Sequence, residues 1–311
     1  MSSATVAAGR RDTIDATAAA LMVGLTFSWG LNYVAAKLSY AGYDPVFLSI
    51  MRSLIGGLCV VGWCRWRGIA LLRRDGTLAA GIGVGLLFGI EFLFLYVGLE
   101  HTTVARNTLL VNSMPFWMLL GGHFLLGEYM TARKVFGLVL AFAGLVLVFA
   151  DKLGAYKDAM LLGDLLSLGA GVAWAATNVL IKRSNLTTVP AEKLLLYQLA
   201  GAAVVGLLVM PFSGPPVRAF ALVPTLALLF QAIFIVAFTY VLWFWMLGRY
   251  PASGLSSFAF LTPVFGVLCG ALLLGEPLSA GVFAALVLIV AGLVIVNRPS
   301  RRQIPGEVPD A

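Results

Sequence analysis

The sequence has few charged residues. Asp, Glu, Lys and Arg make up 11% of its 311 residues, whereas 60% are hydrophobic. Soluble domains carry about 25% charged residues, so this chain has too little polar surface to cover a soluble globule. A spanning helix takes about 20 apolar residues, and ten such helices leave only short loops and no room for a sizeable soluble domain.

Residues for metal, redox or acid–base chemistry are also scarce. The two histidines, His101 and His123, lie at opposite ends of one apolar segment, so they cannot share a catalytic site. The three cysteines include no CxxC pair and predict neither a disulfide framework nor a metal centre. No G-x-x-x-x-G-K-[ST] motif is present, so direct use of ATP is not expected. We expect no metal, no cofactor and no enzymatic activity.

Long apolar segments are what the sequence does contain. They exceed the alternating ten-residue runs of a β-barrel and are apolar on all sides, which indicates helices. Turn and charge signals such as Asp44-Pro45 separate them. The segments cover approximately 16–38, 46–66, 77–99, 103–126, 133–150, 162–182, 191–212, 222–247, 252–274 and 279–297. We therefore predict an all-α integral membrane protein with ten transmembrane helices.

The net charge of +7 is explained by its distribution along the chain. With the N-terminus inside, 15 of the 21 Lys and Arg residues fall on inner loops and tails, five on outer loops, and Arg52 within a span. Lys and Arg accumulate on the cytoplasmic side of membrane proteins. This pattern predicts a multi-pass inner-membrane protein with both termini in the cytoplasm, and it makes a nucleic-acid partner unnecessary.

The second half of the chain repeats the first. Residues 115–148 match residues 263–296 at an offset of 148 without a gap, and roughly half of the paired positions are identical. Each half contains five apolar segments, an odd number, so the second half must enter the bilayer from the opposite side. Inverted repeats are typical of secondary transporters, which bind substrate near the midplane where the repeats meet. We predict two inverted five-helix repeats, 16–150 and 151–297, with cytoplasmic tails at 1–15 and 298–311.

In their order, several motifs resemble the EamA-type branch of the drug/metabolite transporter superfamily. The matching residues are Trp29, Gly30 and Asn32 in the first span, Arg52 in the second, and a proline followed by Leu-Gly-Glu in each half (Pro115 with Gly127-Glu128, Pro263 with Gly275-Glu276). The resemblance covers nearly all of residues 16–297. It implies a ten-helix carrier for small metabolites, often an exporter of amino acids or drug-like compounds, and it does not imply one substrate.

Two charged residues, Arg52 and Glu91, lie within apolar spans. A charge at a helix centre costs about 2.5–3.5 kcal/mol on insertion scales, so each should face the interior and have a partner. Both lie outward of the span centre by about 5–6 Å, at 1.5 Å per residue, on neighbouring spans. We predict that they pair. The pair could be purely structural, or Glu91 could couple transport to protons or bind a substrate ammonium group.

Tryptophans at equivalent positions near the centres of two spans, Trp29 and Trp174, are unusual because tryptophan concentrates at membrane interfaces. They suggest a central aromatic cavity suited to amphipathic solutes and amines, although helix packing would explain them too. Thr239, Tyr240 and Trp243 occupy positions in the eighth span equivalent to those around Glu91 in the third, and could form the opposing wall.

Polar residues within the spans complete the predicted binding site. Asn32, Asn112 and Asn178 must find hydrogen-bond partners, either as links between helices or as groups that orient a substrate. Tyr96 and Trp117 are further candidates for the lining.

A proline occurs at the same depth in each half, Pro115 and Pro263, within a predicted span. Each removes a backbone donor and would kink its helix. The kinks could act as hinges for alternating access or could simply shape the cavity.

Together these features favour a secondary transporter that moves a small amphipathic metabolite, an amino acid or related compound, by alternating access, with export as the expected direction. A broad drug or organic-cation exporter is the alternative within transporters. A membrane-embedded enzyme lacks its residue cluster, and a channel would need a selectivity element that the sequence does not contain. The expected partners are the small-molecule substrate, the lipid bilayer and protons as a candidate coupling ion. The sequence carries no signal for the oligomeric state.

Overall fold

The computed structural model describes residues 13–71, 75–102, 107, 110–149, 160–274 and 280–297. The predicted tails 1–15 and 298–311, apart from 13–15, and the Gly275-Glu276 motif lie outside these residues. In the described part of the chain all regular structure is helical, with one isolated β-bridge between Tyr43 and Val217. The predicted all-α class is confirmed.

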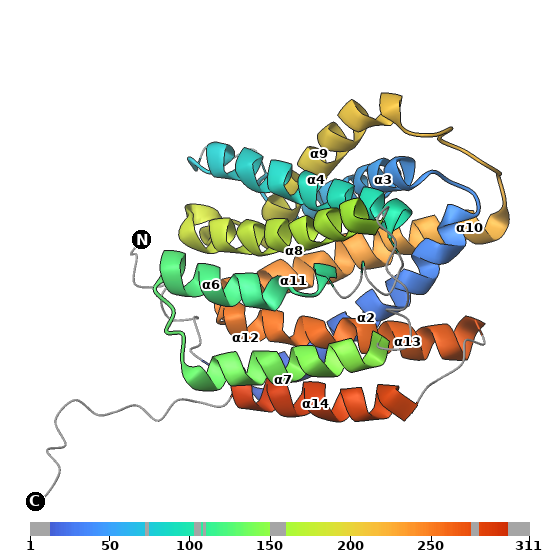
Figure 1. Cartoon of the computed structure of the whole chain (residues 1–311). Helices are drawn as coiled ribbons and strands as arrows, with labels where there is room; N and C mark the ends of the chain where they lie inside the picture. The colour runs from blue at the N-terminus through green and yellow to red at the C-terminus, as the bar shows by residue number, and fades with distance from the viewer. Residues whose placement is uncertain are drawn as a thin grey trace, which may run out of the picture.

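The helices follow one another along the chain with short connections (Figure 1). The first half contains α2 (Ala16–Tyr40), α3 (Pro45–Arg67), α4 (Leu78–His101), α6 (Met114–Leu126) and α7 (Ala132–Phe149). The second half contains α8 (Met160–Arg183), η2 (Asn185–Thr188), α9 (Ala191–Val209), η3 (Met210–Phe212), α10 (Leu222–Phe230), η4 (Gln231–Thr239), α11 (Tyr240–Arg249), α12 (Ala252–Ser257), η5 (Phe258–Phe260), α13 (Leu261–Leu274) and α14 (Ala280–Asn297).

Seven helical runs among the described residues are long and apolar enough to cross a membrane. They are Ala16–Tyr40, Pro45–Arg67, Leu78–Gly98, Met160–Arg183, Ala191–Phe212, Leu222–Arg249 and Ala252–Leu273. Two shorter apolar helices are Met114–Leu126 and Val287–Val296. The chain is therefore a multi-pass helical membrane protein, and the count of ten spans stays a prediction.

The ends of α3 show how the sequence sets helix boundaries. Asp44 precedes the helix and its carboxylate accepts hydrogen bonds from the backbone N–H groups of Val46 and Phe47. Pro45 occupies the first turn, where its missing N–H is not needed. At the other end Gly68 adopts a left-handed conformation with φ of 66°, which glycine allows without strain. The Asp44-Pro45 signal thus starts this span as predicted.

Helices of the two halves interleave rather than forming separate domains. From the first half, α4 packs against α8 and α9 of the second, and α2 packs against α13, α10 and η4. The helices α7 and α14 pack side by side at one side of the molecule, near α13, while α3, α4 and α9 lie on the other side (Figure 1). Residues from both halves therefore meet in the middle of the bundle.

Glycine permits the closest of these helix contacts. A Cβ atom at Gly201 of α9 would overlap the backbone of Gly85 in α4, and one at Gly85 would overlap the carbonyl oxygen of Tyr197. Small residues let helix backbones approach where lipid offers no hydrophobic drive to association. The pairing of α4 with α9 depends on these two glycines.

Polar contacts close the end of the bundle at which α2 begins, called here the near end. Lys193 Nζ lies 2.7 Å from Asp75 Oδ2, and the Thr77 hydroxyl donates to Asp75 Oδ1 at 2.6 Å. Lys193 and Thr77 together hold the pKa of Asp75 at about 2. The hydroxyls of Thr77 and Tyr197 lie 3.2 Å apart, and Asn185 donates to the Asp75 carbonyl. The connection between α3 and α4 is thus tied to the start of α9.

The opposite end, called the far end, is closed by a different pair of loops. Tyr43, between α2 and α3, forms the β-bridge with Val217, between α9 and α10. The hydroxyls of Tyr43 and Thr225 lie 2.8 Å apart, and Arg218 Nη2 lies 3.8 Å from Asp44 Oδ2. Each end of the bundle is therefore closed by contacts between the first half and the second.

Candidate functional site

An aromatic cluster occupies the place where α2, α8 and α11 meet. Its centre is Trp29, whose ring makes edge-to-face contacts with Trp174 at 6.3 Å, Tyr240 at 6.2 Å and Trp243 at 5.6 Å between centroids. The indole N–H of Trp29 donates to Thr239 Oγ1 at 3.0 Å. The structure therefore brings together the two predicted tryptophans and the predicted opposing wall, and we call these five residues the Trp29 cluster.

A π-helix positions part of this cluster. The segment η4 is a π-helix whose last residue is Thr239, and α11 continues directly from Tyr240. Within η4 the Thr239 hydroxyl donates to the Ile235 carbonyl at 2.6 Å, so its oxygen is fixed in place to accept from Trp29. Segments of π-helix occur frequently at functional sites. The apolar pattern of the eighth span gave no signal for this segment.

Arg52 lies beside the cluster and is surrounded by aromatic residues. Its side chain is 3% exposed. One guanidinium nitrogen donates to the Tyr96 hydroxyl at 2.9 Å and the other to the Tyr240 hydroxyl at 3.1 Å. The guanidinium carbon stacks 4.4 Å from the centroid of Phe92. All of these partners are uncharged, so the positive charge of Arg52 has no ionic partner in contact.

The predicted ion pair between Arg52 and Glu91 is wrong as a direct contact. Both residues belong to the described chain, and neither a hydrogen bond nor an ion pair joins them. Glu91 and Tyr96 are five residues apart on α4, which places them about 140° apart around the helix. Arg52 contacts Phe92 and Tyr96 on α4 and makes no direct contact with Glu91, the residue that precedes Phe92. The sequence did not predict which face of α4 Arg52 would contact.

Glu91 is left buried without a full set of partners. It is 5% exposed, and its Oε2 atom has no hydrogen-bond partner. Glu91 directly precedes Phe92, whose ring centroid lies 4.4 Å from the Arg52 guanidinium carbon, so Glu91 and Arg52 lie in the same region of the bundle. A buried charge without a contacting partner costs several kcal/mol, and ionisable residues within membrane spans mark functional sites by default. Arg52 and Glu91 therefore contribute a guanidinium and a carboxyl group to one site without contacting each other.

The three predicted asparagines differ in their surroundings. Asn178 is 1% exposed and both of its amide atoms lack hydrogen-bond partners. Asn32 Oδ1 also lacks a partner. Asn112 donates to the Tyr33 hydroxyl at 3.5 Å and lies in the turn just before α6. Asn112 is therefore a link between helices, whereas Asn32 and Asn178 retain unused polar atoms.

Trp117 does not join the cluster. Its indole N–H donates to Ser113 Oγ at 3.1 Å, one turn earlier in the chain, and the ring packs against the general hydrophobic core. No described contact connects it to Trp29. The sequence placed Trp117 in a span but gave no information on which side of α6 it would lie.

Each proline lies just after a change in helix geometry. Pro115 is in the first turn of α6, just after the turn at Asn112 and Ser113. Pro263 is the third residue of α13 and follows the 3-10 segment η5. Proline fits the first turn because the N–H groups there have no intrahelical partner. The backbone hydrogen bonding of each span therefore changes just before its proline, while Ala252–Leu273 remains one helical run. A kink or hinge at these positions stays a prediction.

Sequence reasoning identified Tyr96 as a lining candidate but missed the aromatic row on α4 to which it belongs. Phe88, Phe92 and Tyr96 recur every four residues and form a continuous row of ring contacts, and Phe88 packs edge-on against Tyr240 at 6.0 Å. The four-residue spacing of these aromatics was the signal that could have identified them. Phe88 contacts Tyr240 of the Trp29 cluster, and Tyr96 at the other end of the row accepts a hydrogen bond from Arg52.

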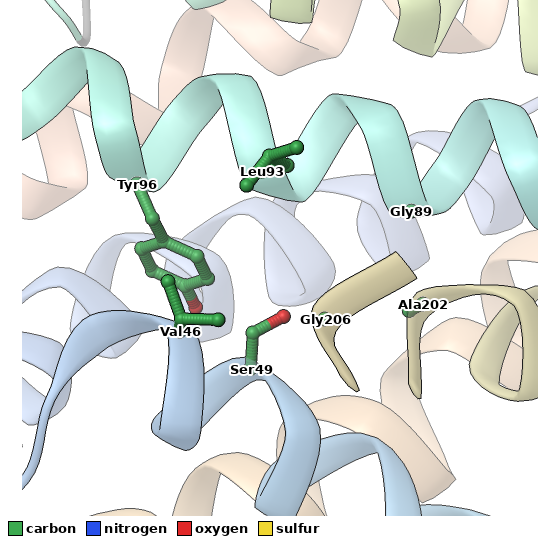
Figure 2. Close-up of a pocket in the computed structure, with 7 residues that line it drawn as sticks. All are labelled: Val46, Ser49, Gly89, Leu93, Tyr96, Ala202 and Gly206. Atoms are coloured by element: carbon green, nitrogen blue, oxygen red, sulfur yellow. The ribbon is translucent and has the colours of Figure 1, made fainter. Parts of the chain in front are cut away.

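A small pocket adjoins Tyr96 between α3, α4 and α9. Figure 2 shows the Tyr96 ring extending from α4 toward Val46 and Ser49 of α3. The lining residues are Val46, Ser49, Gly89, Leu93, Tyr96, Ala202 and Gly206. Tyr96 also accepts a hydrogen bond from Arg52, so one lining residue of the pocket contacts the buried guanidinium.

Across the described residues no group of three or more His, Cys, Asp or Glu side chains could hold a metal ion.

Comparison with known proteins agrees with this arrangement. A model of the EamA-like transporter family matches residues 16–150 and again residues 161–298. The chain is 30% identical over 295 residues to the uncharacterized transporter YvbV of Bacillus subtilis, covering 92% of this chain and 93% of that protein. It is 27% identical over 276 residues to a probable amino-acid metabolite efflux pump of Escherichia coli, covering 86% of this chain and 90% of that one.

A solved crystal structure shares the fold. Its chain is 23% identical to this one, with a TM-score of 0.77, and the match covers 90% of this chain and 96% of the other. At this level of identity the likeness supports the fold alone. The match of the family model to both halves shows that the chain belongs to the EamA-like transporter family.

Proposed function

We propose that the protein is a secondary transporter that moves a small amphipathic metabolite, an amino acid or related compound, by alternating access around the Trp29 cluster. The observation that carries this proposal is the composition of the cluster. Trp29 comes from the first half of the chain, and Trp174, Tyr240 and Trp243 come from the second. A relative movement of the halves would change a site built from both, as alternating access requires.

The proposed architecture is ten helices in two inverted repeats, 16–150 and 151–297. If each helix of the first repeat corresponds to the helix five spans later, packing contacts should occur in matched pairs. The contact of α4 with α8 corresponds to that of η4 and α10 with α2, and the contact of α2 with α13 corresponds to that of α8 with α6. The pair α7 and α14 corresponds to itself. The two matches of the family model also support two repeats.

The loops at the two ends support alternating access in the same way. At the near end Asp75, in the connection between α3 and α4, contacts Lys193 at the start of α9. The equivalent elements of the other repeat are the connection between α9 and α10, which contains Val217, and the start of α3, which Tyr43 precedes. At the far end Tyr43 and Val217 form the β-bridge, so the near-end tie and the far-end tie are equivalent contacts. Transport requires one tie to open while the other holds, which exposes the Trp29 cluster to one side at a time. The interruptions before Pro115 and Pro263 lie at equivalent places in the repeats, and we assign them as the hinges of this movement.

We assign the near end to the cytoplasm and the protein to the inner membrane, with both termini inside. The support is the excess of Lys and Arg on the loops of that side. Export as the direction is supported by the name of the E. coli relative, a probable efflux pump.

A broad exporter of drugs or organic cations is the second candidate. It is favoured by one observation, the buried Glu91 carboxylate next to aromatic rings, which would attract any amphipathic amine. The two candidates differ in whether the solute must also carry a carboxylate.

Counterflow in proteoliposomes tests the proposal. Vesicles preloaded with one unlabelled solute should accumulate the same labelled solute, because only a carrier exchanges substrate across the membrane without net flow. A panel of amino acids, peptides and organic cations, assayed with and without a pH gradient, identifies substrate and coupling together. Trp174→Ala should weaken the apparent affinity for the exchanged solute, whereas the exposed Trp63→Ala serves as the control. Efflux without trans-stimulation would contradict a carrier.

A further inference from the structure

Arg52 and Glu91 contribute a guanidinium and a carboxyl group to one site. Both residues are more than nine-tenths buried, at 3% and 5% exposure. Arg52 stacks on the ring of Phe92, the residue that follows Glu91, but no hydrogen bond or ion pair joins Arg52 and Glu91 in the described chain. A buried ionisable group without a contacting partner of opposite charge lacks the attraction that would offset the desolvation of its charged form. A ligand with both charges would supply that attraction at both groups.

The guanidinium of Arg52 is arranged to bind a carboxylate. Its planar fork matches two carboxylate oxygens, and two of its nitrogens already donate to hydroxyl oxygens, those of Tyr96 and Tyr240. These neutral acceptors fix the orientation of the fork. A carboxylate would replace weak neutral acceptors by charged ones, and the two freed hydroxyls could themselves donate to it.

The carboxylate of Glu91 is arranged to bind a cation. Its Oε2 atom is buried and accepts no hydrogen bond. A substrate ammonium group carries three N–H donors, and it would both donate to this oxygen and stabilise the carboxylate form of Glu91. The Trp29 cluster includes Tyr240, one of the acceptors of Arg52, and its aromatic rings provide apolar surface for the remainder of the ligand.

We propose that Arg52 binds the carboxylate and Glu91 the ammonium group of one zwitterionic substrate, so that the site selects α-amino acids over amines and acids of the same skeleton. This assignment rests on the proposed carrier function and specifies its substrate class. An amine would leave Arg52 without an ionic partner, and an acid would leave Glu91 without one. Sites that hydrogen-bond a substrate group reject analogues lacking it strongly, so we expect a preference of about 100-fold or more.

Matched ligand sets provide the test. Each set holds one amino acid, the amine that lacks its carboxylate and the acid that lacks its amino group, built on the skeletons of leucine, phenylalanine and threonine. Binding is measured by competition in proteoliposome exchange and, independently of transport, by the thermal shift of the purified protein. For the skeleton that is exchanged, the wild-type protein should bind the amino acid about 100-fold or more tightly than either analogue.

Single substitutions separate the two roles. In Arg52→Gln the amino acid should lose its advantage over the amine but keep its advantage over the acid. In Glu91→Gln the advantage over the acid should be lost and that over the amine retained. Arg52→Lys keeps the positive charge and should keep part of the preference. Arg249→Gln is the control, because Arg249 also stacks on an aromatic ring, that of Trp245, but outside this site.

The outcomes distinguish this assignment from the carrier function itself. Equal binding of an amine or an acid by the wild-type protein would overturn zwitterion recognition, as would exchange of some other solute without any amino acid of the three sets. Equal weakening of all three ligands in Arg52→Gln and Glu91→Gln would assign both residues a structural role. In each of these cases the proposed carrier function remains supported as long as some solute of the panel is exchanged. If no solute of the whole panel is exchanged, the proposed function is contradicted as well.

Discussion

The hydroxyl of Tyr240 should contribute more to stability than an ordinary tyrosine hydroxyl in this protein. It accepts from Arg52 at 3.1 Å, while its ring contacts Trp29 and Phe88. Tyr240→Phe deletes only the oxygen and leaves a buried guanidinium N–H without an acceptor. Hydrogen bonds to charged groups contribute about 1.5–3 kcal/mol, so the free energy of unfolding should fall by about that amount. Tyr96→Phe should behave alike, because Tyr96 holds the other nitrogen.

Tyr43 provides the matched control for this prediction. Like Tyr96 it is buried, and its hydroxyl lies 2.8 Å from the neutral hydroxyl of Thr225, so Tyr43→Phe should cost about 0.5–1.5 kcal/mol. Unfolding of the purified protein in mixed micelles by increasing denaturant gives the three values on one scale. A cost for Tyr43→Phe equal to that of Tyr240→Phe would refute the reasoning that the buried charge of Arg52 makes its acceptors important.

Two further predictions concern helix packing and the near end. Gly201→Ala should lower the free energy of unfolding by about 1–3 kcal/mol, because the added Cβ would overlap the α4 backbone. Gly62→Ala is the control: no atom lies near its added Cβ, so it should raise the free energy of unfolding by up to about 1 kcal/mol. Equal effects of the two substitutions would contradict the close approach of α4 and α9. The pKa of Asp75 is about 2 in the folded protein against an ordinary 3.8, so the folded state binds fewer protons. The contribution of Asp75 to stability is present above about pH 4 and lost as the pH falls toward 2. Unfolding midpoints of wild type and Asp75→Asn should therefore converge over this window, and a gap that persists at pH 2 would contradict the contact with Lys193.

The sequence was informative wherever one residue type had one physical consequence. Composition required helices in a membrane, and Asp44-Pro45 started α3 where predicted. The equivalence of Trp29 and Trp174 placed both near span centres, and the structure brings their rings within 6.3 Å. These predictions needed only length, hydropathy and repeat position.

Predictions that depended on helix faces failed. Arg52 and Glu91 were predicted to pair because of their similar depth in neighbouring spans, but Arg52 contacts the face of α4 that carries Tyr96. Rotation about a helix axis is set by packing against several neighbours, and in spans that are apolar all round the sequence has no amphipathic pattern to reveal it. The same lack of pattern concealed the direction of Trp117.

Interruptions of helices were recognised only in part. The sequence indicated that Pro115 and Pro263 disturb their spans, but proline permits either a kink or a new helix start. Which one forms depends on whether neighbouring groups satisfy the freed backbone carbonyls. The π-helix η4 has no proline at all within Gln231–Thr239, so no residue in it announces the altered hydrogen bonding.

The inverted arrangement of the two halves can be tested directly by the side of the membrane on which each end lies. In a variant with Cys59, Cys64 and Cys269 replaced, a single cysteine is placed at Gly76, by the near-end tie, or at Ala219, by the far-end loop. A membrane-impermeant maleimide should label position 219 in intact cells and position 76 only in inside-out vesicles. Labelling of both positions from the same side would contradict the inverted repeats and, with them, alternating access around the Trp29 cluster.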